Sequence, residues 1–220
     1  MLLIMEVIII ILFIIFARMN TADIVTGDAL WTQRYSAFQD VNVMIVVGFG
    51  FLMTFIKRYS WSALAYTFFI NAIIVQTYIL LKSFWQRVWN GFSQQGTFIL
   101  VDQVLITESS YAVASALIAF GALIGRIGPR ELLLIGWVQM VGYSLNELVV
   151  DQSINAFDAG GSMTIHAFGA YFGLTVSLIL SHKIAPVSKP ESNYISNIVA
   201  MIGTLFLWLF WPSFNFGAFA

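Results

Sequence analysis

The sequence predicts an all-α protein, a polytopic membrane helix bundle, and three observations indicate this. Apolar residues make up 60% of the 220 residues and charged residues only 10%, whereas soluble proteins average about 45–50% and about 25%. The apolar residues gather in seven runs that reach or approach the roughly 20 residues that a bilayer-crossing helix needs. The runs also lack the strict alternation of barrel strands, which favours helices.

Seven segments are expected to form the transmembrane helices. In chain order they are residues 2–17, 41–56, 61–81, 110–126, 131–150, 160–181 and 195–211. Together they account for most of the chain, so no room is left for a soluble domain.

The first segment has an alternative interpretation as a signal peptide. However, it has no basic residues before its apolar run, it carries Glu6, and residues 17–19 form a poor cleavage site. We therefore expect a retained helix.

Basic residues predict the orientation of the bundle, because cytoplasmic loops carry an excess of lysine and arginine. Alternate short connections hold six of the ten: Lys57, Arg58, Arg126, Arg130, Lys183 and Lys189. The other connections are expected to hold Arg18, Arg34, Lys82 and Arg87 with Asp23, Asp28, Asp40, Asp102, Glu108 and Asp151. This alternation places the N-terminus in the cytoplasm. The acidic outer connections either favour cations near that face or serve only solubility.

The composition also excludes several classes of protein. There is no cysteine, so disulfide scaffolds, thiol catalysis and cysteine-based zinc sites are excluded. A net charge of -1 argues against a nucleic-acid binder, which would show a basic stripe. With His166 and His182 as the two histidines, a multi-histidine metal site is not favoured. We expect no metal and no cofactor.

Four polar residues fall within or beside the predicted spans. Glu147 and Asn146 lie near the outer end of the fifth span, where an interfacial role is favoured over a role in transport. His182 lies beside Lys183 at a predicted cytoplasmic edge and is interpreted as an interfacial residue.

His166 differs from these residues because apolar sequence continues on its C-terminal side. An ionisable residue inside a span usually faces a bundle interior or a cavity. Asp158 precedes the same helix, where a carboxylate can accept N–H bonds from the first turn. The spacing of Gly169 and Gly173 is the small-residue pattern that permits close helix packing. These residues leave two interpretations of His166 open, a satisfied structural group or a pore-lining one.

Three long strings resemble the Rhesus (Rh) branch of the ammonium transporter family. They run from Phe38 to Phe55, from Asp158 to Tyr171 and from Met201 to Asn215. The resemblance covers nearly the whole chain, in order and with matching spacing. The first segment also resembles the extra N-terminal helix of Rh glycoproteins.

The resemblance implies a homotrimer in the plasma membrane, with a narrow apolar conduit for ammonia, and in Rh members also carbon dioxide, through each protomer. His166 matches the first of two facing histidines of that conduit. Asp158 matches a carboxylate that recruits substrate or holds local structure. The family's outer gate is a pair of stacked phenylalanines, which correspond here to Phe214 and Tyr111. The tyrosine keeps the aromatic face and adds a hydroxyl.

Elementary energetics indicates which species such a conduit carries. Moving an intact ammonium-like ion into a dry medium costs tens of kcal/mol on a Born estimate. Removing a proton at neutral pH from an amine of pKa ~10 costs about 4 kcal/mol. The neutral gas is therefore favoured, and aromatic rings at the mouth hold the cation by roughly 1–2 kcal/mol. No covalent step is needed, so we do not expect an enzyme.

The chain departs from the family pattern in its length. The resemblance implies a single membrane domain over 1–220, with an extra helix at 1–20, a first repeat at 38–182 and the start of a second repeat at 194–220. Family members run to about twice this length, because their second repeat supplies the other histidine. We therefore expect an incomplete subunit. Asn42 stands where Rh members commonly have histidine, so surface polarity is expected to change there.

Three functional hypotheses follow. The first is an Rh-type ammonia channel subunit. The second is a non-conducting Rh-like structural or assembly partner in a membrane complex. The third, a proton-coupled secondary transporter, is disfavoured because few acidic residues are expected inside the spans.

Overall fold

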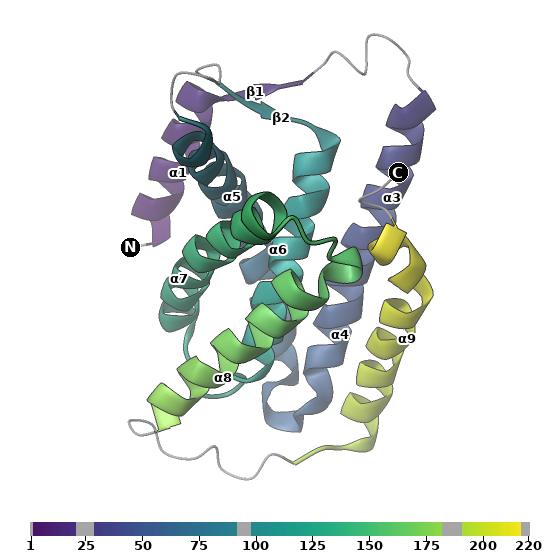
Figure 1. Ribbon diagram of the computed structural model, residues 1–220. Helices are drawn as coiled ribbons and strands as arrows, with labels where there is room; N and C mark the ends of the chain where they lie inside the picture. Colours follow the sequence, from purple (N-terminus) through teal and green to yellow (C-terminus); the bar gives the residue numbers. More distant parts are fainter. Residues whose placement is uncertain (1, 21–28, 92–97, 182–190, 217–220) are drawn as a thin grey trace.

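Figure 1 shows the computed structural model, which describes residues 2–20, 29–91, 98–181 and 191–216. Most of these residues are helical. In chain order the elements are α1 (Leu2–Phe16), β1 (Ala17–Met19), α3 (Ala29–Val43), the π-helix η1 (Met44–Phe49), α4 (Gly50–Leu52), the 3₁₀ turns η2 (Met53–Phe55) and η3 (Lys57–Tyr59), α5 (Ser60–Asn90), β2 (Ile99–Val101), α6 (Gln103–Gly121), α7 (Pro129–Leu148), the π-helix η4 (Val149–Ile154), the 3₁₀ turn η5 (Ala159–Gly161), the π-helix η6 (Ser162–Ala167), α8 (Phe168–Ser181) and α9 (Tyr194–Phe216).

Six helical stretches are long and apolar enough to cross a membrane. They are Arg34–Phe55, Lys57–Asn90, Gln103–Gly121, Pro129–Ile154, Ala159–Leu180 and Tyr194–Phe216. They correspond to the last six predicted segments. The first predicted segment is also helical, but α1 has 15 residues, which is shorter than the roughly 20 that a bilayer requires.

The structure corrects two boundaries that decide where charged residues lie. The predicted span 61–81 continues to Asn90, so Lys82 and Arg87 lie on α5 rather than in a connection. Glu108 likewise lies on α6, which begins seven residues before the predicted span 110–126. Asp102 starts α6 because its carboxylate accepts the backbone N–H of Leu105 at 2.8 Å.

The start of the second predicted span and the end of the last one also differ from the expectation. Asp40 lies on α3, which begins at Ala29 rather than at 41. α9 continues through Pro212 to Phe216, beyond the predicted end at 211. Since Ser213 donates to the Asp40 carboxylate at 2.7 Å, both extensions meet in one contact.

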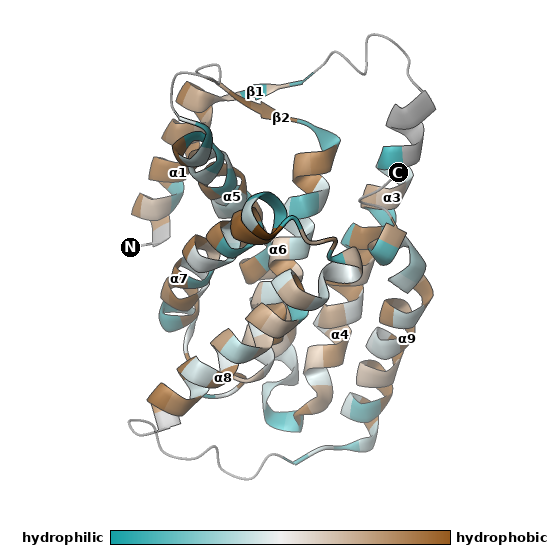
Figure 2. Cartoon of the chain, in the orientation of Figure 1, coloured by the Kyte–Doolittle hydropathy of each residue, from teal (hydrophilic) through white to brown (hydrophobic). Residues whose placement is uncertain are grey.

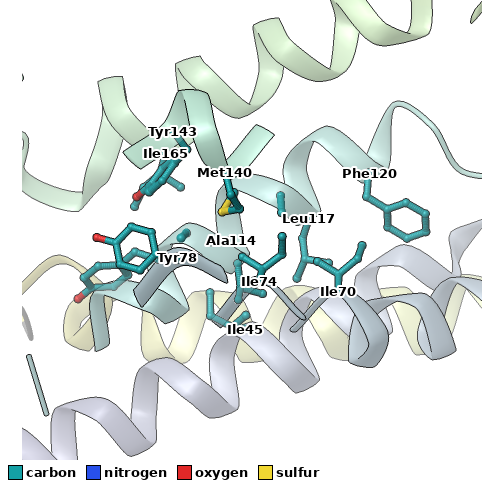
Figure 3. Packing of buried hydrophobic residues seen from close by; sticks show 14 of the residues in the cluster. Ile45, Ile70, Ile74, Tyr78, Ala114, Leu117, Phe120, Met140, Tyr143 and Ile165 are labelled. Carbon is teal, nitrogen blue, oxygen red and sulfur yellow. The ribbon is translucent and has the colours of Figure 1, made fainter. Parts of the chain in front are cut away.

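α6 is the central helix of the bundle. In its most apolar stretch 67% of the residues are buried inside the protein, whereas the corresponding share in α9 is 17%. α6 packs against α5, α7 and α8, and α9 packs on the far side against α3, η1 and α4 (Figure 1). The core between α5, α6 and α7 is apolar, and Figure 3 shows Ile74, Leu117 and Met140 meeting there.

Large apolar side chains are exposed on α8 and α9, which suits contact with lipid or protein. Figure 2 shows hydrophobic residues, in brown, on both helices. Tyr171, Leu174 and Leu178 of α8 are exposed, as are Ile195, Met201 and Trp208 of α9. A soluble protein would hide such surfaces, so the exposed faces agree with a membrane protein.

A short parallel strand pair joins β1 to β2 and was not expected from the sequence. Each strand has three residues, too few to show a periodic pattern. Arg18 places its guanidinium over the ring of Phe98 at 4.3 Å, next to this pair. The pair therefore links the end of α1 to the start of α6.

Two of the basic connections meet at one end of the bundle. Tyr59, which follows Lys57 and Arg58, lines a cavity together with Arg126. Lys183 and Lys189 lie outside the described residues, as do Asp23 and Asp28. The common end agrees with the predicted alternation, while the assignment of that end to the cytoplasm stays a prediction.

Candidate functional site

A cavity of about 230 Å³ lies near the end of the bundle opposite these basic connections. Three predicted site residues line it, Tyr111 from α6, Asp158 before η5 and Phe214 from α9. The other lining residues are Glu108, Tyr143, Glu147, Asp151, Ala156, Phe157, Gly160, Gly161, Thr164, Ile165 and Asn215. Since this lining has four carboxylates and no lysine or arginine, the cavity attracts cations.

Asp158 organises the start of the helix that carries His166. Its carboxylate accepts the backbone N–H of Met163 at 3.1 Å and that of Thr164 at 2.8 Å. The Thr164 hydroxyl donates to the same carboxylate at 2.8 Å. The expected capping of the first turn by Asp158 is therefore present.

The turn between Asp158 and η6 requires two glycines. Gly160 and Gly161 have φ values of 71° and 66°, a region that side chains other than glycine rarely adopt. A Cβ on Gly160 would overlap the amide oxygen of Asn215, and one on Gly161 would overlap Ile165. This turn thus lets the chain reverse closely against α9.

His166 lies in η6 and is half-buried. Its Nδ1 lies 3.1 Å from the carbonyl oxygen of Gly161. Because a carbonyl can only accept, Nδ1 carries the proton, and Nε2 of a neutral imidazole keeps its lone pair. The ring packs edge-on against Trp211 and Phe214, with centroid distances of 5.7 Å and 6.2 Å.

Tyr111 and Phe214 meet between the cavity and His166. Their ring centroids lie 4.8 Å apart at an interplanar angle of 72°, so the contact is edge-to-face rather than the stacked arrangement expected from the family pattern. The Tyr111 hydroxyl donates to the Phe214 carbonyl at 3.1 Å, which explains the difference, because the bond fixes how the tyrosine ring approaches. The ring stacked on Phe214 is that of Trp211, at 5.4 Å and 10°.

A buried charge network beside the cavity was missed by the sequence prediction. The Lys82 ammonium lies 2.8 Å from the Glu108 carboxylate and 3.4 Å from that of Glu147. Tyr78 donates to Glu147 at 2.6 Å. The Glu147 side chain is only 13% exposed and contacts both Lys82 and Tyr78. Its expected place near the membrane interface stays a prediction. The sequence offers one indication of this ion pair. Lys82 directly follows the apolar run 61–81, and Glu108 shortly precedes the next run, 110–126.

Close packing holds η6 and α8 against α6. A Cβ on Gly169 would lie 2.7 Å from the carbonyl oxygen of Ser115, and one on Gly173 would lie 2.7 Å from Cα of Ala119. The predicted small-residue pattern is therefore confirmed, with α6 as the helix that it approaches. Gln139 of α7 donates to the same Ser115 carbonyl at 2.9 Å.

The remaining candidates take no part in this site. His182 lies outside the described residues. Asn42 is half-buried on α3 and does not line the cavity. Among the described residues, no three histidine, aspartate or glutamate side chains gather as metal ligands. The arrangement consists of an acidic cavity, an aromatic pair and a histidine with an available nitrogen.

Known proteins are similar to this chain over most of its length. The Ammonium Transporter Family is matched over residues 1–220. Ammonium transporter Rh type C of Pongo abelii is 43% identical over 97% of this chain and 45% of its own length. Ammonium transporter Rh type B of Bos taurus is 42% identical over 93% of this chain and 46% of its own length. The chain spans about half the length of these relatives.

A solved structure is similar as well. The structure is that of Rh50 of Nitrosomonas europaea, described as one of the Rhesus protein family of channels. The similar region covers 85% of this chain and 49% of the Rh50 chain. The TM-score is 0.72 and the sequence identity is 36%.

Proposed function

Because the chain belongs to the ammonium transporter family, we propose that it acts as an Rh-type ammonium channel subunit that passes neutral ammonia. The observation that carries this proposal is the position of Phe214. It lines the acidic cavity together with Tyr111, and its ring contacts both Tyr111 and His166.

The acidic cavity supports a role in recruiting the cation. Its four carboxylates, Glu108, Glu147, Asp151 and Asp158, raise the local concentration of ammonium. The faces of Tyr111 and Phe214 add cation–π attraction, about 0.5–2 kcal/mol depending on desolvation. Asp158 is already engaged by backbone N–H groups, so its role in this proposal is to position the start of η6.

Passage beyond the aromatic pair favours loss of a proton. A bare ammonium ion cannot leave water for an apolar passage without a penalty of tens of kcal/mol, whereas deprotonation near neutral pH costs about 4 kcal/mol. Nε2 of His166 then accepts an N–H bond from ammonia, because its Nδ1 proton is held by Gly161. His166 thereby offers the neutral molecule a partner inside the membrane.

The proposal extends to the organisation of the subunit. Residues 1–220 form one membrane domain, with an extra helix at 1–20, a first repeat at 38–182 and the start of a second repeat at 194–220. The packing of α9 on η1 and α4, on the other side of the bundle from α8, supports treating α9 as a separate unit. We further propose a homotrimer in the plasma membrane, a cytoplasmic N-terminus, and carbon dioxide as a second permeant gas.

The test is transport by the 220-residue chain in liposomes loaded with a pH-sensitive dye. Entry of neutral ammonia binds internal protons, so the lumen becomes alkaline faster than in empty liposomes. We expect His166→Ala to slow the ammonia-dependent signal at least about tenfold, equivalent to about 1.4 kcal/mol. His182→Ala, the control at the second histidine, keeps the native rate.

Two outcomes would overturn the proposal. One is an alkalinisation rate equal to that of empty liposomes. The other is a native rate that His166→Ala leaves unchanged. An acidification of the lumen would show instead that the ion itself crosses and releases protons inside.

A further inference from the structure

The ammonium group of Lys82 sits in a surrounding that would suit a free ammonium ion. It lies 2.8 Å from a Glu108 oxygen and 3.4 Å from a Glu147 oxygen. The ring of Tyr78 lies 5.6 Å away, within the range of a cation–π contact. The Lys82 side chain is only 11% exposed, so the charge is held inside the protein.

These carboxylates belong to the cation-attracting cavity, whereas the lysine reaches them from outside it. Glu108 and Glu147 line the cavity that contains Tyr111 and Phe214. Lys82 instead lines a neighbouring cavity of about 380 Å³, which shares Glu108 with the first. The lysine therefore neutralises part of the acidic wall without standing in the space where a cation enters.

We propose that Lys82 is a tethered ammonium that occupies the strongest cation position of the wall and thereby limits the affinity of the cavity for free ammonium. This inference rests on the proposed function. It makes Lys82 a residue that sets the substrate affinity. Lys82 sets one positive charge against two carboxyl groups, those of Glu108 and Glu147.

A low affinity suits a channel, because a cation held tightly at the mouth leaves slowly. With Lys82 removed, the two carboxylates face each other without a counter-ion and bind any small cation that enters the cavity. A purely structural role for Lys82 predicts something else, namely a loss of stability with no change in the affinity of the folded protein.

The experiment measures equilibrium binding of radiolabelled methylammonium to the full chain in nanodiscs near neutral pH. Lys82→Met keeps the aliphatic stem and removes the charge. We expect its Kd to fall at least about tenfold, since nearby unit charges interact by a few kcal/mol at a protein surface. Lys82→Arg keeps the charge and should retain the native Kd.

Two further variants separate the local site from general electrostatics. Arg87→Met removes a positive charge from the same helix, at a residue that lines the neighbouring cavity but not the cavity of Glu147. Its Kd should stay native. Glu108→Gln removes one of the two carboxyl groups and leaves Lys82 with Glu147 alone, so binding should weaken.

Lys82→Met alone leaves the carboxylates of Glu108 and Glu147 without their counter-ion and can fail to fold. The double variant Lys82→Met, Glu108→Gln retains a single carboxylate, Glu147, and covers this case. Its Kd should be at least about tenfold below that of Glu108→Gln. Equal Kd values for these two variants, or for Lys82→Met and the native chain, would overturn the inference.

Failure of this inference is distinguishable from failure of the proposed function. Binding in nanodiscs does not require passage through the membrane. A chain that fails to alkalinise liposomes but binds methylammonium more tightly without Lys82 refutes the channel and supports the lysine's role. A chain that conducts, and whose charge variants all bind alike, refutes only the role of Lys82.

Discussion

Tyr111 contacts Phe214 twice, through the edge of its ring and through its hydroxyl. The ring centroids lie 4.8 Å apart, and the hydroxyl donates to the Phe214 carbonyl at 3.1 Å. Phe214 stands among the last four residues of α9, whose carbonyls lack donors within the helix. Tyr111 therefore fastens the end of α9 to α6 on the wall of the cavity.

Tyr111→Phe tests this fastening. The ring contact is retained and the buried carbonyl loses its donor, so the free energy of unfolding should fall by about 1 kcal/mol. The measurement is unfolding by SDS titration in mixed micelles. Tyr66→Phe is the matched control, because Tyr66 also packs edge-on against a phenylalanine, Phe120, and its hydroxyl has no hydrogen bond among the described residues. Equal losses in the two variants would show that the bond contributes nothing.

Asp158→Ala tests the turn before His166. The carboxylate accepts two backbone N–H groups and one hydroxyl, so its removal should lower the free energy of unfolding by about 2 kcal/mol. Ammonia-dependent alkalinisation should fall as well, because η6 loses its anchor. Asp102→Ala removes a cap with a single bond to Leu105 and should cost about 1 kcal/mol. The interpretation fails if Asp158→Ala is no more destabilising than Asp102→Ala.

Much of the fold follows from the composition of local segments. The last six apolar runs become six membrane-length helices, because the cost of exposing backbone polar groups to lipid leaves a helix as the available form. The ends of these helices are less predictable. The charge of Lys82 predicts the end of a span, whereas Glu108 and Glu147 make that charge tolerable inside the bundle.

The site divides in the same way. Asp158 could be predicted as a cap because the bond joins residues five and six positions apart. The Lys82 network joins three helices, and no local pattern indicates which helices will be neighbours. The edge-to-face geometry of Tyr111 and Phe214 also depends on a contact between α6 and α9, so a family pattern of two phenylalanines predicts the pair but not its angle.

Gly173→Ala tests the close approach of α8 to α6. The added methyl would lie 2.7 Å from Cα of Ala119, so the helices must move apart, at about 1–3 kcal/mol. Gly121→Ala is the control within α6, since its nearest neighbour is the Met53 methyl at 3.5 Å. There the higher helix propensity of alanine should leave stability unchanged or raise it by up to about 1 kcal/mol. Similar midpoints for the two variants in SDS titration would contradict the packing role of Gly173.

Tyr78→Phe tests how strongly the buried charge network depends on its one neutral donor. Tyr78 is fully buried and donates to Glu147 at 2.6 Å. A hydrogen bond to a charged group contributes about 1.5–3 kcal/mol. We therefore expect Tyr78→Phe to lower the free energy of unfolding, measured by SDS titration, by this amount.

Tyr143→Phe provides the comparison for this variant. Its ring centroid lies 5.8 Å from that of Tyr78, and Figure 3 labels both residues. Its hydroxyl has no hydrogen bond among the described residues. It should stay within about 0.5 kcal/mol of the native chain. If both variants unfold alike, Lys82 alone satisfies Glu147 and the tyrosine serves only to fill the core. If only Tyr78→Phe is weakened, the Glu147 carboxylate needs both partners, because Glu147 shares its lysine with Glu108.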